Sequence, residues 1–395
     1  MGSIKDKVAI IGMGCTEFRE AWAKDPFDLM VDATYEAYDD AGVGPKDIEA
    51  VFVGNQLTFQ TSAAAASALK LVNIPVTRVE NACATGTEAV RMAAYSIAAG
   101  IYDVVLALGI EKLKDTGFSG LPQDYNQPGQ INKTWRQQSA VTVANFAMMA
   151  TSYFNAYGLS PDDGKRILAQ IAVKNHHNGN LTSKAMLRNE ISLDQALNAP
   201  IIAWPLGLYD CCGVSDGASA AILCRANLAK SFRQDPIYIK SLQICSSGYQ
   251  GLLNPEYDFT HIEASVLAGQ KAYTEAGIKN PRKEISVANV HDCFTITELT
   301  IYEDLGFSPR GRAKEDVESG AFSLSGDLPV NTDGGLKCFG HPIGASGIRM
   351  IYEIYQQLQQ KAGKRQVKNP IWGLTHNYGG HPPWGVAAVT ILGNF

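Results

Sequence analysis

The stretch Val79-Glu-Asn-Ala-Cys-Ala-Thr-Gly-Thr-Glu-Ala-Val-Arg-Met92 decides the fold. A cysteine followed by small residues, and then by apolar residues at helical spacing, indicates a tight turn that places Cys83 at the start of a buried helix. The amides and the positive dipole of a helix N-terminus favour a thiolate, which is the nucleophilic form of cysteine. The alternative is an inert core cysteine, the usual fate of a lone Cys among alanines.

A second stretch repeats the first. At an offset of 258 residues (341 minus 83), His341-Pro-Ile-Gly-Ala-Ser-Gly-Ile-Arg-Met350 aligns with Cys83–Met92, so that His341 falls on Cys83. At an offset of 235 (277 minus 42), an Ala-x3-Ala-Tyr-x2-Ala-Gly pattern ends at both Gly42 and Gly277. The chain is therefore predicted to be an internal duplication. Corresponding helix starts would be related by a pseudo-twofold axis, so Cys83 and His341 are expected to open helices that face one pocket.

The length and the element pattern predict an α/β protein of two halves. A chain of 395 residues exceeds one ordinary core, and the repeat divides it into an N-terminal half, 1–233, and a C-terminal half, 234–395. Alternating strands and helices predict mainly parallel sheets with helices on their faces. The region at about 114–204 breaks this pattern and is interpreted as an insertion with one good helix at 141–157. Strands are predicted at 7–12, 50–53, 103–108, 285–290 and 386–392, and a helix at 29–41 closed by glycine. Residues 213–223 are expected to return to the core, and residues 237–244 to open the second half.

Composition narrows the function classes. A net charge of −5 without a basic tract argues against a nucleic-acid partner. No signal segment and no apolar run long enough for a bilayer is present, so we expect a cytoplasmic protein that does not enter membranes. The eight cysteines form no CxxC pair, which predicts reduced thiols and neither a disulfide framework nor a metal site. His176 and His177 are interpreted as a solvated helix end rather than as metal ligands.

Polar residues follow two predicted strands where those strands end. Residues 287–290 run into His291-Asp-Cys-Phe294, and residues 371–374 run into a glycine-rich loop at 375–385. Open α/β sheets bind ligands at the carboxyl ends of their strands. Each feature alone has a neutral alternative, since His291 could satisfy a carbonyl, Cys293 could fill the core, and the glycines could form an ordinary turn. Together with Cys83 and His341 they predict one active site.

Four motifs resemble the signatures of the thiolase superfamily: 81–86 (Asn-Ala-Cys-Ala-Thr-Gly), 210–218 (Asp-Cys-Cys-Gly-Val-Ser-Asp-Gly-Ala), 291–294 (His-Asp-Cys-Phe) and 340–347 (Gly-His-Pro-Ile-Gly-Ala-Ser-Gly). The His-Asp-Cys-Phe motif points to the sterol-carrier-protein-type branch. The resemblance implies a thiolase-like five-layer αβαβα fold made of two duplicated halves, in a dimer or tetramer. It also implies acyl-CoA substrates, coenzyme A as cosubstrate, and no permanently bound metal or redox cofactor.

The matching motifs also imply roles for individual residues. Cys83 would be the nucleophile that holds the acyl group, and His341 the base that activates it. His291 would stabilise the enolate oxygen, and Cys293 would deliver and remove protons. Backbone N–H groups of Cys83 and Gly379 would form the oxyanion hole for the acyl-enzyme carbonyl.

The last loop departs from the family pattern. Many thiolases have Cys-x-Gly there and use that cysteine as the acid and base, whereas this chain has Asn377-Tyr-Gly379. Cys293 is therefore expected to replace it. The adjacent His381-Pro-Pro-Trp384 is interpreted as a pocket wall or a partner contact, with a plain surface loop as the alternative.

Three function classes follow. The first is a CoA-dependent thiolase that cleaves a 3-oxoacyl-CoA. The second is a Cys-His-His C-acyltransferase or condensing enzyme without CoA thiolysis, against which Cys293 argues, because decarboxylation supplies its own carbanion. The third is a non-catalytic subunit, which the intact Cys83 and His341 disfavour.

The resemblance extends to partners and substrate. The insertion lacks a run of Lys and Arg for the CoA phosphates, and relatives in this branch work with a small zinc-ribbon and OB-fold partner, so such a partner is expected beside a homodimer core. Similarity to the large subunits of 2-benzoylsuccinyl-CoA thiolases favours cleavage of that substrate to benzoyl-CoA and succinyl-CoA. No spacing in the sequence identifies an aromatic acyl group.

Overall fold

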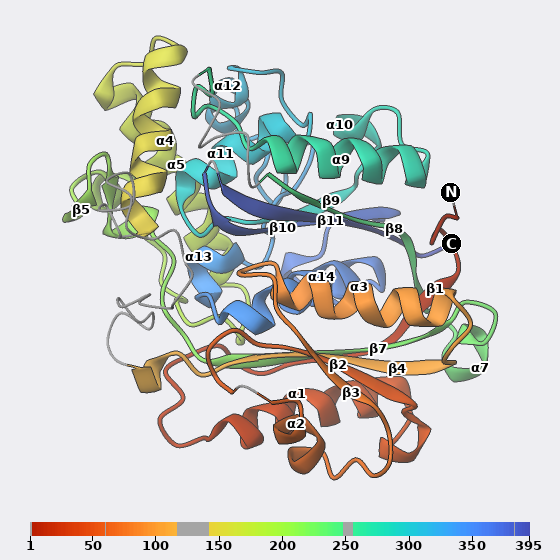
Figure 1. Cartoon of the computed structure of the whole chain (residues 1–395). Helices are drawn as coiled ribbons and strands as arrows, with labels where there is room; N and C mark the ends of the chain where they lie inside the picture. The colour runs from red at the N-terminus through yellow and green to blue at the C-terminus, as the bar shows by residue number, and fades with distance from the viewer. Residues whose placement is uncertain (1, 60, 117–141, 248–255, 383) are drawn as a thin grey trace.

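The computed structural model describes residues 2–59, 61–116, 142–247, 256–382 and 384–395. Its elements form five layers in which helices and sheets alternate (Figure 1). Two helices, α3 and α14, lie between the sheets, and further helices cover the outer face of each sheet (Figure 1). The predicted five-layer αβαβα fold is thus confirmed. The layer helices are α1 (Pro26–Ala41), α2 (Ala63–Ala68), α3 (Thr85–Ala98), α9 (Glu263–Ala276), α10 (Pro281–Glu284), α11 (Thr295–Asp304), α12 (Ala313–Glu318) and α14 (Ile343–Leu358).

The strands of both sheet layers form one hydrogen-bonded series, in the order β3-β2-β4-β7-β1-β8-β11-β10-β9. Strands β1 and β8 pair at only two positions, Ala9 with Tyr238 and Ile10 with Ile237, so the layers are joined at one corner. The strands are β1 (Val8–Cys15), β2 (Ala50–Gly54), β3 (Val76–Val79), β4 (Val104–Glu111), β7 (Gly217–Arg225), β8 (Ile237–Ser246), β9 (Val287–Val290), β10 (Trp372–His381) and β11 (Trp384–Gly393).

The prediction of mainly parallel sheets is wrong. Among the described strands of this series, three pairs are parallel (β2 with β3, β2 with β4, β9 with β10) and five are antiparallel. The reason is one reversed strand in each half. Strand β7 runs between β4 and β1, and β11 runs between β10 and β8, antiparallel to both neighbours.

The internal duplication is confirmed by equivalent elements. Helices α1 and α9 each end at a left-handed glycine, Gly42 with φ 70° and Gly277 with φ 87°. Each of these glycines donates its N–H to the carbonyl of the tyrosine four residues earlier. Both repeats predicted from the sequence therefore fall on matching helices, the outer pair α1 and α9 and the central pair α3 and α14.

Glycines let the two central helices approach closely. A Cβ atom on Gly86 of α3 would lie 2.7 Å from the carbonyl oxygen of Gly344. A Cβ atom on Gly347 of α14 would lie 2.5 Å from the backbone nitrogen of Thr87. Only glycine fits these positions, and the N-terminal ends of the two helices are thereby brought together.

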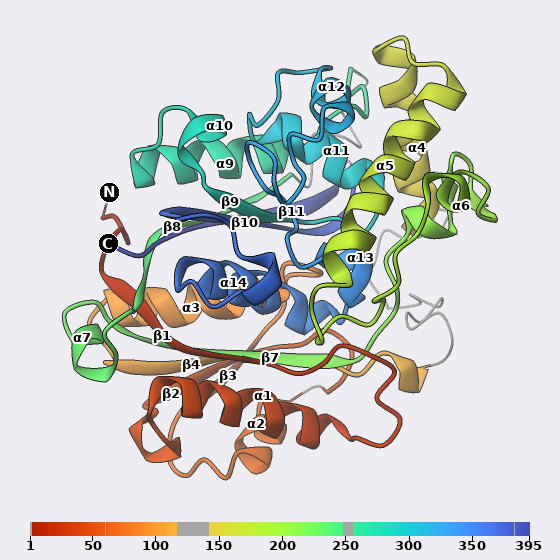
Figure 2. The same ribbon diagram turned by 180° about the vertical axis from the view of Figure 1, so that it is seen from behind.

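The elements at 142–204 lie beside one end of the layers, next to α13 (Figures 1 and 2). The helix predicted at 141–157 is present as α4, although its first residue lies outside the described residues. The remaining elements in the described residues are α4 (Thr142–Ala156), α5 (Pro161–Gly179), α6 (Leu193–Leu197), β5 (Ile201–Ala203), β6 (Leu206–Gly207), α7 (Ala229–Phe232), α13 (Gly335–Phe339) and short 3-10 helices at Pro45–Asp47, Lys114–Thr116, Leu208–Asp210 and Gly363–Arg365.

The loop predicted at 375–385 is a strand for most of its length. Strand β10 continues to His381, and its ladder with β11 ends at the pair His381 and Trp384. Two glycines did not break this strand because a hairpin partner satisfies its backbone groups along the whole ladder. Of the four residues His381–Trp384, the third, Pro383, lies outside the described residues.

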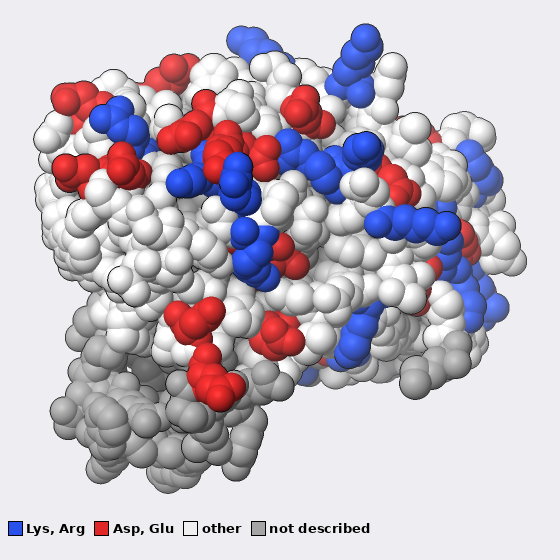
Figure 3. All heavy atoms as spheres, turned by 90° about the horizontal axis from the view of Figure 1, so that it is seen from above, with Lys and Arg blue, Asp and Glu red and all other residues white. Residues whose placement is uncertain are grey.

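The character of the helices and the charge of one face of the molecule both bear on function. None of the helices in the described parts of the chain has the length and apolar character needed to cross a bilayer. On the face above the outer helices α9 to α12, Lys and Arg side chains are mixed with Asp and Glu rather than gathered into one basic patch (Figure 3).

Candidate active site

The segment before α3 is a tight turn. Ala82 adopts a left-handed backbone with φ 48°, which is strained for a residue with a side chain. Thr85 stabilises the turn, because its Oγ1 accepts from the N–H of Asn81 at 2.8 Å and donates to the carbonyl of Ala82 at 2.5 Å. Cys83 therefore stands two residues before the first residue of α3, as its sequence predicts.

The surroundings of Cys83 favour its protonated thiol. Burial raises its pKa to about 12, and Glu111 and Glu80 act in the same direction. The backbone N–H of Gly380 and its own N–H contact the sulfur and oppose this rise. Desolvation thus raises the pKa of Cys83 more than the helix start lowers it, so the expected thiolate is not favoured. A base has to remove the proton.

Strand β10 runs directly against the Cys83 turn. A Cβ atom on Gly379 would lie 2.8 Å from the Cys83 nitrogen and 2.7 Å from the Asn81 oxygen. Gly379 thus lies where its sequence motif predicts, beside the Cys83 amide. The amide that reaches the sulfur itself belongs to the next residue, Gly380, which the sequence did not indicate.

His341 is a neutral base. Burial and the cation of Arg349 lower its pKa to about 3. Its Nδ1 lies 2.8 Å from the hydroxyl of Ser346, and that hydroxyl lies 3.0 Å from the carbonyl of Pro342. The carbonyl of Pro342 can only accept, so the hydroxyl proton of Ser346 is donated to it. The Ser346 oxygen then accepts a hydrogen bond from Nδ1–H of His341. The buried Nε2, which has no partner among the described residues, then carries a lone pair.

His291 lies beside His341. Their ring centroids are 5.2 Å apart and the rings are nearly perpendicular, at 83°. Burial, followed by His341, His376 and Arg349, lowers the pKa of His291 well below its ordinary value, so this ring is also neutral. Its Nδ1 lies 3.3 Å from Nδ2 of Asn377.

Cys293 lies in the buried core at the start of α11. Its Sγ is 3.8 Å from Oγ1 of Thr297. Burial raises its pKa well above the ordinary value, with further contributions from Cys212 and Cys83, which shows that the three sulfurs are electrostatically coupled. The raised pKa favours the protonated thiol of Cys293 over its thiolate.

The segment 211–213 connects the loop at Cys293 with the loop at His341 through backbone hydrogen bonds. Its Cys212 N–H donates to the carbonyl of Cys293 at 2.8 Å, and the carbonyl of Gly213 accepts from the N–H of His341 at 3.0 Å. Sequence reasoning missed this role, and it also missed Cys212 as a third thiol of the site. The signal was present in the motif at 210–218, whose two adjacent cysteines had been given no function.

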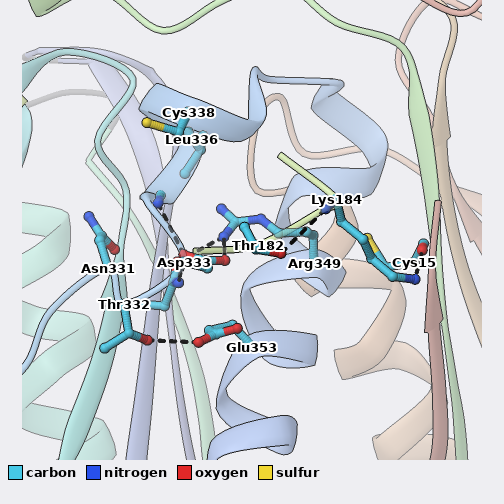
Figure 4. Close-up of polar contacts among 12 residues, drawn as sticks. Cys15, Thr182, Lys184, Asn331, Thr332, Asp333, Leu336, Cys338, Arg349 and Glu353 are labelled. Carbon is cyan, nitrogen blue, oxygen red and sulfur yellow. Dashed lines mark hydrogen bonds and ion pairs between the residues drawn. The ribbon is translucent and has the colours of Figure 1, made fainter. Parts of the chain in front are cut away.

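Buried carboxylates support the site from behind. Asp292, between His291 and Cys293, accepts from the N–H groups of Leu336 and Lys337 at 2.7 and 3.2 Å and so holds the start of α13. Asp333 forms an ion pair with Arg349 of α14 (Figure 4). Its Oδ1 accepts from Asn289 of β9 at 2.8 Å.

A third carboxylate, Glu111, ties the end of β4 to the start of α14. It accepts from the N–H of Gly344 at 3.2 Å and from Leu57 and Thr58 at 2.9 and 2.8 Å. Sequence reasoning did not find these supports, because no motif marks a carboxylate that acts through backbone amides.

The interpretation of His176 as a solvated residue is wrong. This ring is buried at the end of α5, with Nδ1 at 2.8 Å from the carbonyl of Asn189 and Nε2 at 3.2 Å from Nζ of Lys337. Its neighbour His177 is exposed and contacts Glu190 at 3.0 Å. The last turn of α5 packs against α13, which covers the first histidine but not the second. In the described residues no group of three His, Cys, Asp or Glu side chains could hold a metal ion.

Comparisons with known proteins agree with this geometry. Residues 8–227 match the model of the thiolase N-terminal domain, and residues 250–394 match that of the thiolase C-terminal domain-like family. Acetyl-CoA acetyltransferase of Methanothermobacter thermautotrophicus is 37% identical over 98% of this chain and 99% of its own.

More distant relatives cover the same length of this chain. Sterol carrier protein 2 of Gallus gallus is 31% identical over 94% of this chain and 70% of its own. Benzoylsuccinyl-CoA thiolase subunit BbsB of Thauera aromatica is 30% identical over 95% and 96%. Among solved structures, the Ltp2-ChsH2(DUF35) aldolase superimposes with a TM-score of 0.85 at 25% identity, over 100% of this chain and 99% of that one. The chain therefore belongs to the thiolase superfamily of acyltransferases, in its sterol-carrier-protein-2-like branch.

Proposed function

We propose that this chain is a CoA-dependent thiolase that cleaves a 3-oxoacyl-CoA through an acyl group on Cys83. The observation that supports it is the meeting of two neutral histidines, His341 and His291, with two coupled thiols, Cys83 and Cys293. A nucleophile, a base, an oxyanion stabiliser and a proton carrier are the groups that thiolysis requires.

The first half of the reaction uses Cys83 and His341. The lone pair on Nε2 of His341 takes the proton of Cys83, and the thiolate attacks the keto carbon of the substrate. The tetrahedral oxyanion is stabilised by the N–H groups of Cys83 and Gly379. When the carbon–carbon bond breaks, its electron pair leaves on the shorter CoA ester as an enolate, and Cys83 keeps the acyl group.

The second half uses His291 and Cys293. The enolate oxygen is stabilised by His291, and Cys293 gives its proton to the enolate carbon, which releases the shorter acyl-CoA. The resulting Cys293 thiolate removes the proton from incoming CoA. The CoA sulfur then attacks the acyl group on Cys83, and the proton on His341 returns to Cys83.

We propose as the specific substrate 2-benzoylsuccinyl-CoA, which would be cleaved to benzoyl-CoA and succinyl-CoA. The similarity to the subunit BbsB supports this assignment. The acetyl-CoA acetyltransferases of Methanothermobacter thermautotrophicus and Methanocaldococcus jannaschii, at 37% and 38% identity, instead favour a short acyl group. Incubation of the enzyme with CoA and a panel of 3-oxoacyl-CoAs, with products identified by mass, decides between them. A preference for acetoacetyl-CoA would contradict the aromatic assignment.

The structural likeness to an aldolase favours a second candidate. Retro-aldol cleavage of a 3-hydroxyacyl-CoA needs neither free CoA nor a cysteine nucleophile, whereas thiolysis needs both. A Cys-His-His C-acyltransferase is a third possibility. It would need the nucleophile Cys83, but it would not need free CoA for thiolysis. Trapping of an acyl adduct on Cys83 together with a strict requirement for CoA would exclude both alternatives.

The wider organisation is part of the proposal. The chain divides near 233/234 into two halves with an insertion at about 114–204, and works as a homodimer core with a small zinc-ribbon and OB-fold partner. The DUF35 component named in the aldolase neighbour supports such a partner. Eight free thiols suit a reducing compartment, so we place the enzyme in the cytoplasm.

A further inference from the structure

We infer that Asn377 is a positioning residue that fixes the tautomer of His291, so that this histidine always presents Nε2–H to the substrate. The inference rests on the proposed function, because it gives a reason for the direction in which His291 acts. Asn377 stands where other thiolases hold a cysteine, and its side chain is fully buried.

The contacts of Asn377 form a short relay between α3 and β9. Oγ1 of Thr87 donates to Oδ1 of Asn377 at 3.0 Å. In the structure Oδ1 of Asn377 faces Thr87, and the NH2 group faces His291. That group, Nδ2, lies 3.3 Å from Nδ1 of His291. An amide nitrogen can only donate, so Nδ1 of His291 has to accept, and the single proton of the neutral ring is on Nε2.

The two histidines of the site are thereby held in opposite tautomers. Ser346 accepts from Nδ1–H of His341 and leaves a lone pair on its Nε2. Asn377 donates to Nδ1 of His291 and leaves a proton on its Nε2. Nε2 of His341 can therefore only take a proton, as a base for Cys83 requires. Nε2 of His291 can only donate a hydrogen bond, as stabilisation of an enolate oxygen requires.

The relay is also held in place sterically. Gly347 of α14 lies against both partners, since a Cβ atom there would be 2.5 Å from Oδ1 of Asn377 and 2.5 Å from Oγ1 of Thr87. The close packing leaves the amide no room to move away from Thr87. Among the described residues, Asn377 is the hydrogen-bond partner of the buried His291 ring, so its amide favours one tautomer of that ring.

The test combines nitrogen NMR with kinetics. In protein labelled with 15N-histidine, at pH 8, each ring nitrogen with a proton resonates apart from each one without. The spectrum of a His291→Gln variant identifies the His291 signals. We expect wild-type His291 to carry its proton on Nε2, and His341 to carry its proton on Nδ1. A proton on Nδ1 of His291 would overturn the inference whatever the activity.

Asn377→Asp is the sharpest variant, because it keeps the volume and the acceptor for Thr87 but replaces the donor by an oxygen. It should move the His291 proton to Nδ1 and lower kcat for carbon–carbon cleavage by about 10²- to 10³-fold, with KM little changed. Acylation of Cys83 by an activated thioester should persist, because that step does not use His291. Cleavage at the wild-type rate would overturn the inference.

A second pair of variants keeps the test decisive if Asn377→Asp does not fold. Thr87→Val removes the hydroxyl that orients the amide and should give a mixed His291 tautomer with reduced kcat, whereas Thr87→Ser should restore both. Equal spectra and rates for the two variants would contradict the relay. Failure of the proposed function is separate: it would appear as a wild-type protein that forms no adduct on Cys83, while the resting tautomers could still be measured.

Discussion

Cys83 and Cys293 are both buried thiols with a raised pKa, yet their surroundings assign them different steps. Cys83 lies among backbone amides, and Cys293 lies in an apolar core beside a threonine hydroxyl. We expect Cys83→Ala to abolish every acyl transfer, because no covalent intermediate forms. Intact-protein mass spectrometry after incubation with an activated thioester would show no adduct. An adduct on this variant would move the nucleophile elsewhere, with Cys212 as the next thiol to test.

Cys293→Ala should behave differently. Its Cys83 should still be acylated, but carbon–carbon cleavage should fall by about 10²- to 10⁴-fold, the effect of losing a general acid and base. Cys224→Ala, in a buried strand far from the site along β7, is the matched control and should cleave at the wild-type rate. If Cys293→Ala cleaves a 3-oxoacyl-CoA undiminished, the Cys-His-His acyltransferase becomes the better description.

For single residues, the sequence predicted which side chains form the candidate site better than it predicted their protonation states. Cys83, His291, Cys293 and His341 are brought to one place, but the thiolate expected at Cys83 is not favoured. A helix start contributes a local effect that can be recognised in the sequence, whereas the opposing desolvation depends on residues far along the chain that bury the sulfur. Asn377, Ser346 and Cys212 were missed for the same reason, since their roles exist only through contacts made in the folded chain.

Among the secondary-structure elements, the site depends on the close contact between helices α3 and α14. Gly347→Ala places a Cβ atom 2.5 Å from the Thr87 nitrogen and 2.5 Å from Oδ1 of Asn377, so the helices have to separate. We expect a loss of about 1–3 kcal/mol in the free energy of unfolding from overpacking, measured by urea denaturation, and a larger loss of cleavage activity.

Gly44→Ala serves as the control for this substitution. Its Cβ atom would have only one neighbour, Oδ2 of Asp47 at 4.0 Å, and its φ of −136° suits any residue. The control should retain both stability and activity. A Gly347→Ala variant as active as this control would show that the two helix ends need not be in contact.

Elements with strong local signals were predicted well, and those set by pairing were not. Helix α1, with its apolar spacing and terminal glycine, was predicted within three residues of its observed start and at its observed end. Strand β10 was expected to stop before 375, because glycines and polar residues there resemble a loop. Its extension and the reversed direction of β7 and β11 depend on neighbouring strands, which no local pattern encodes.

At the scale of the molecule, four buried histidines make stability sensitive to acid. Burial lowers the pKa of His176 to about 4 and of His341 and His376 to about 3, and lowers that of His291 as well. An unfolded histidine has a pKa near 6.5, so unfolding takes up protons below that pH. Their contribution to stability is complete above about pH 6.5 and is lost as pH falls toward the folded values. Burial raises the pKa of Asp304 to about 6 and also raises that of Asp292, and these two groups work in the opposite direction.

His376 isolates one such contribution. It contacts Ser265 of α9 at 2.8 Å and belongs to no catalytic step. His376→Asn should lower the slope of the unfolding free energy against pH by about 1.4 kcal/mol per unit between pH 5.5 and 4, the value for one proton. Urea denaturation across this range measures the slope. His177→Asn, at an exposed position, should leave it unchanged, and equal slopes for both variants would contradict the assignment.

The whole complex, rather than this chain, should be the active unit. Without a partner the chain should bind and turn over acyl-CoA poorly, because the region at about 114–204 has no run of Lys and Arg in its sequence for the CoA phosphates. Kinetics of the purified chain, alone and with a zinc-ribbon and OB-fold partner, test this. Full activity of the lone chain would contradict the need for a partner.

The duplication has a consequence for biosynthesis. The nucleophile is on α3's entry turn and its base on the entry of α14, 258 residues later (341 minus 83). At a translation rate of about 5–20 residues per second, the base leaves the ribosome roughly 13–52 s after the nucleophile. During that interval His341 is not available to take the proton of Cys83. The pairing of this nucleophile with its base can therefore form only when synthesis is nearly complete.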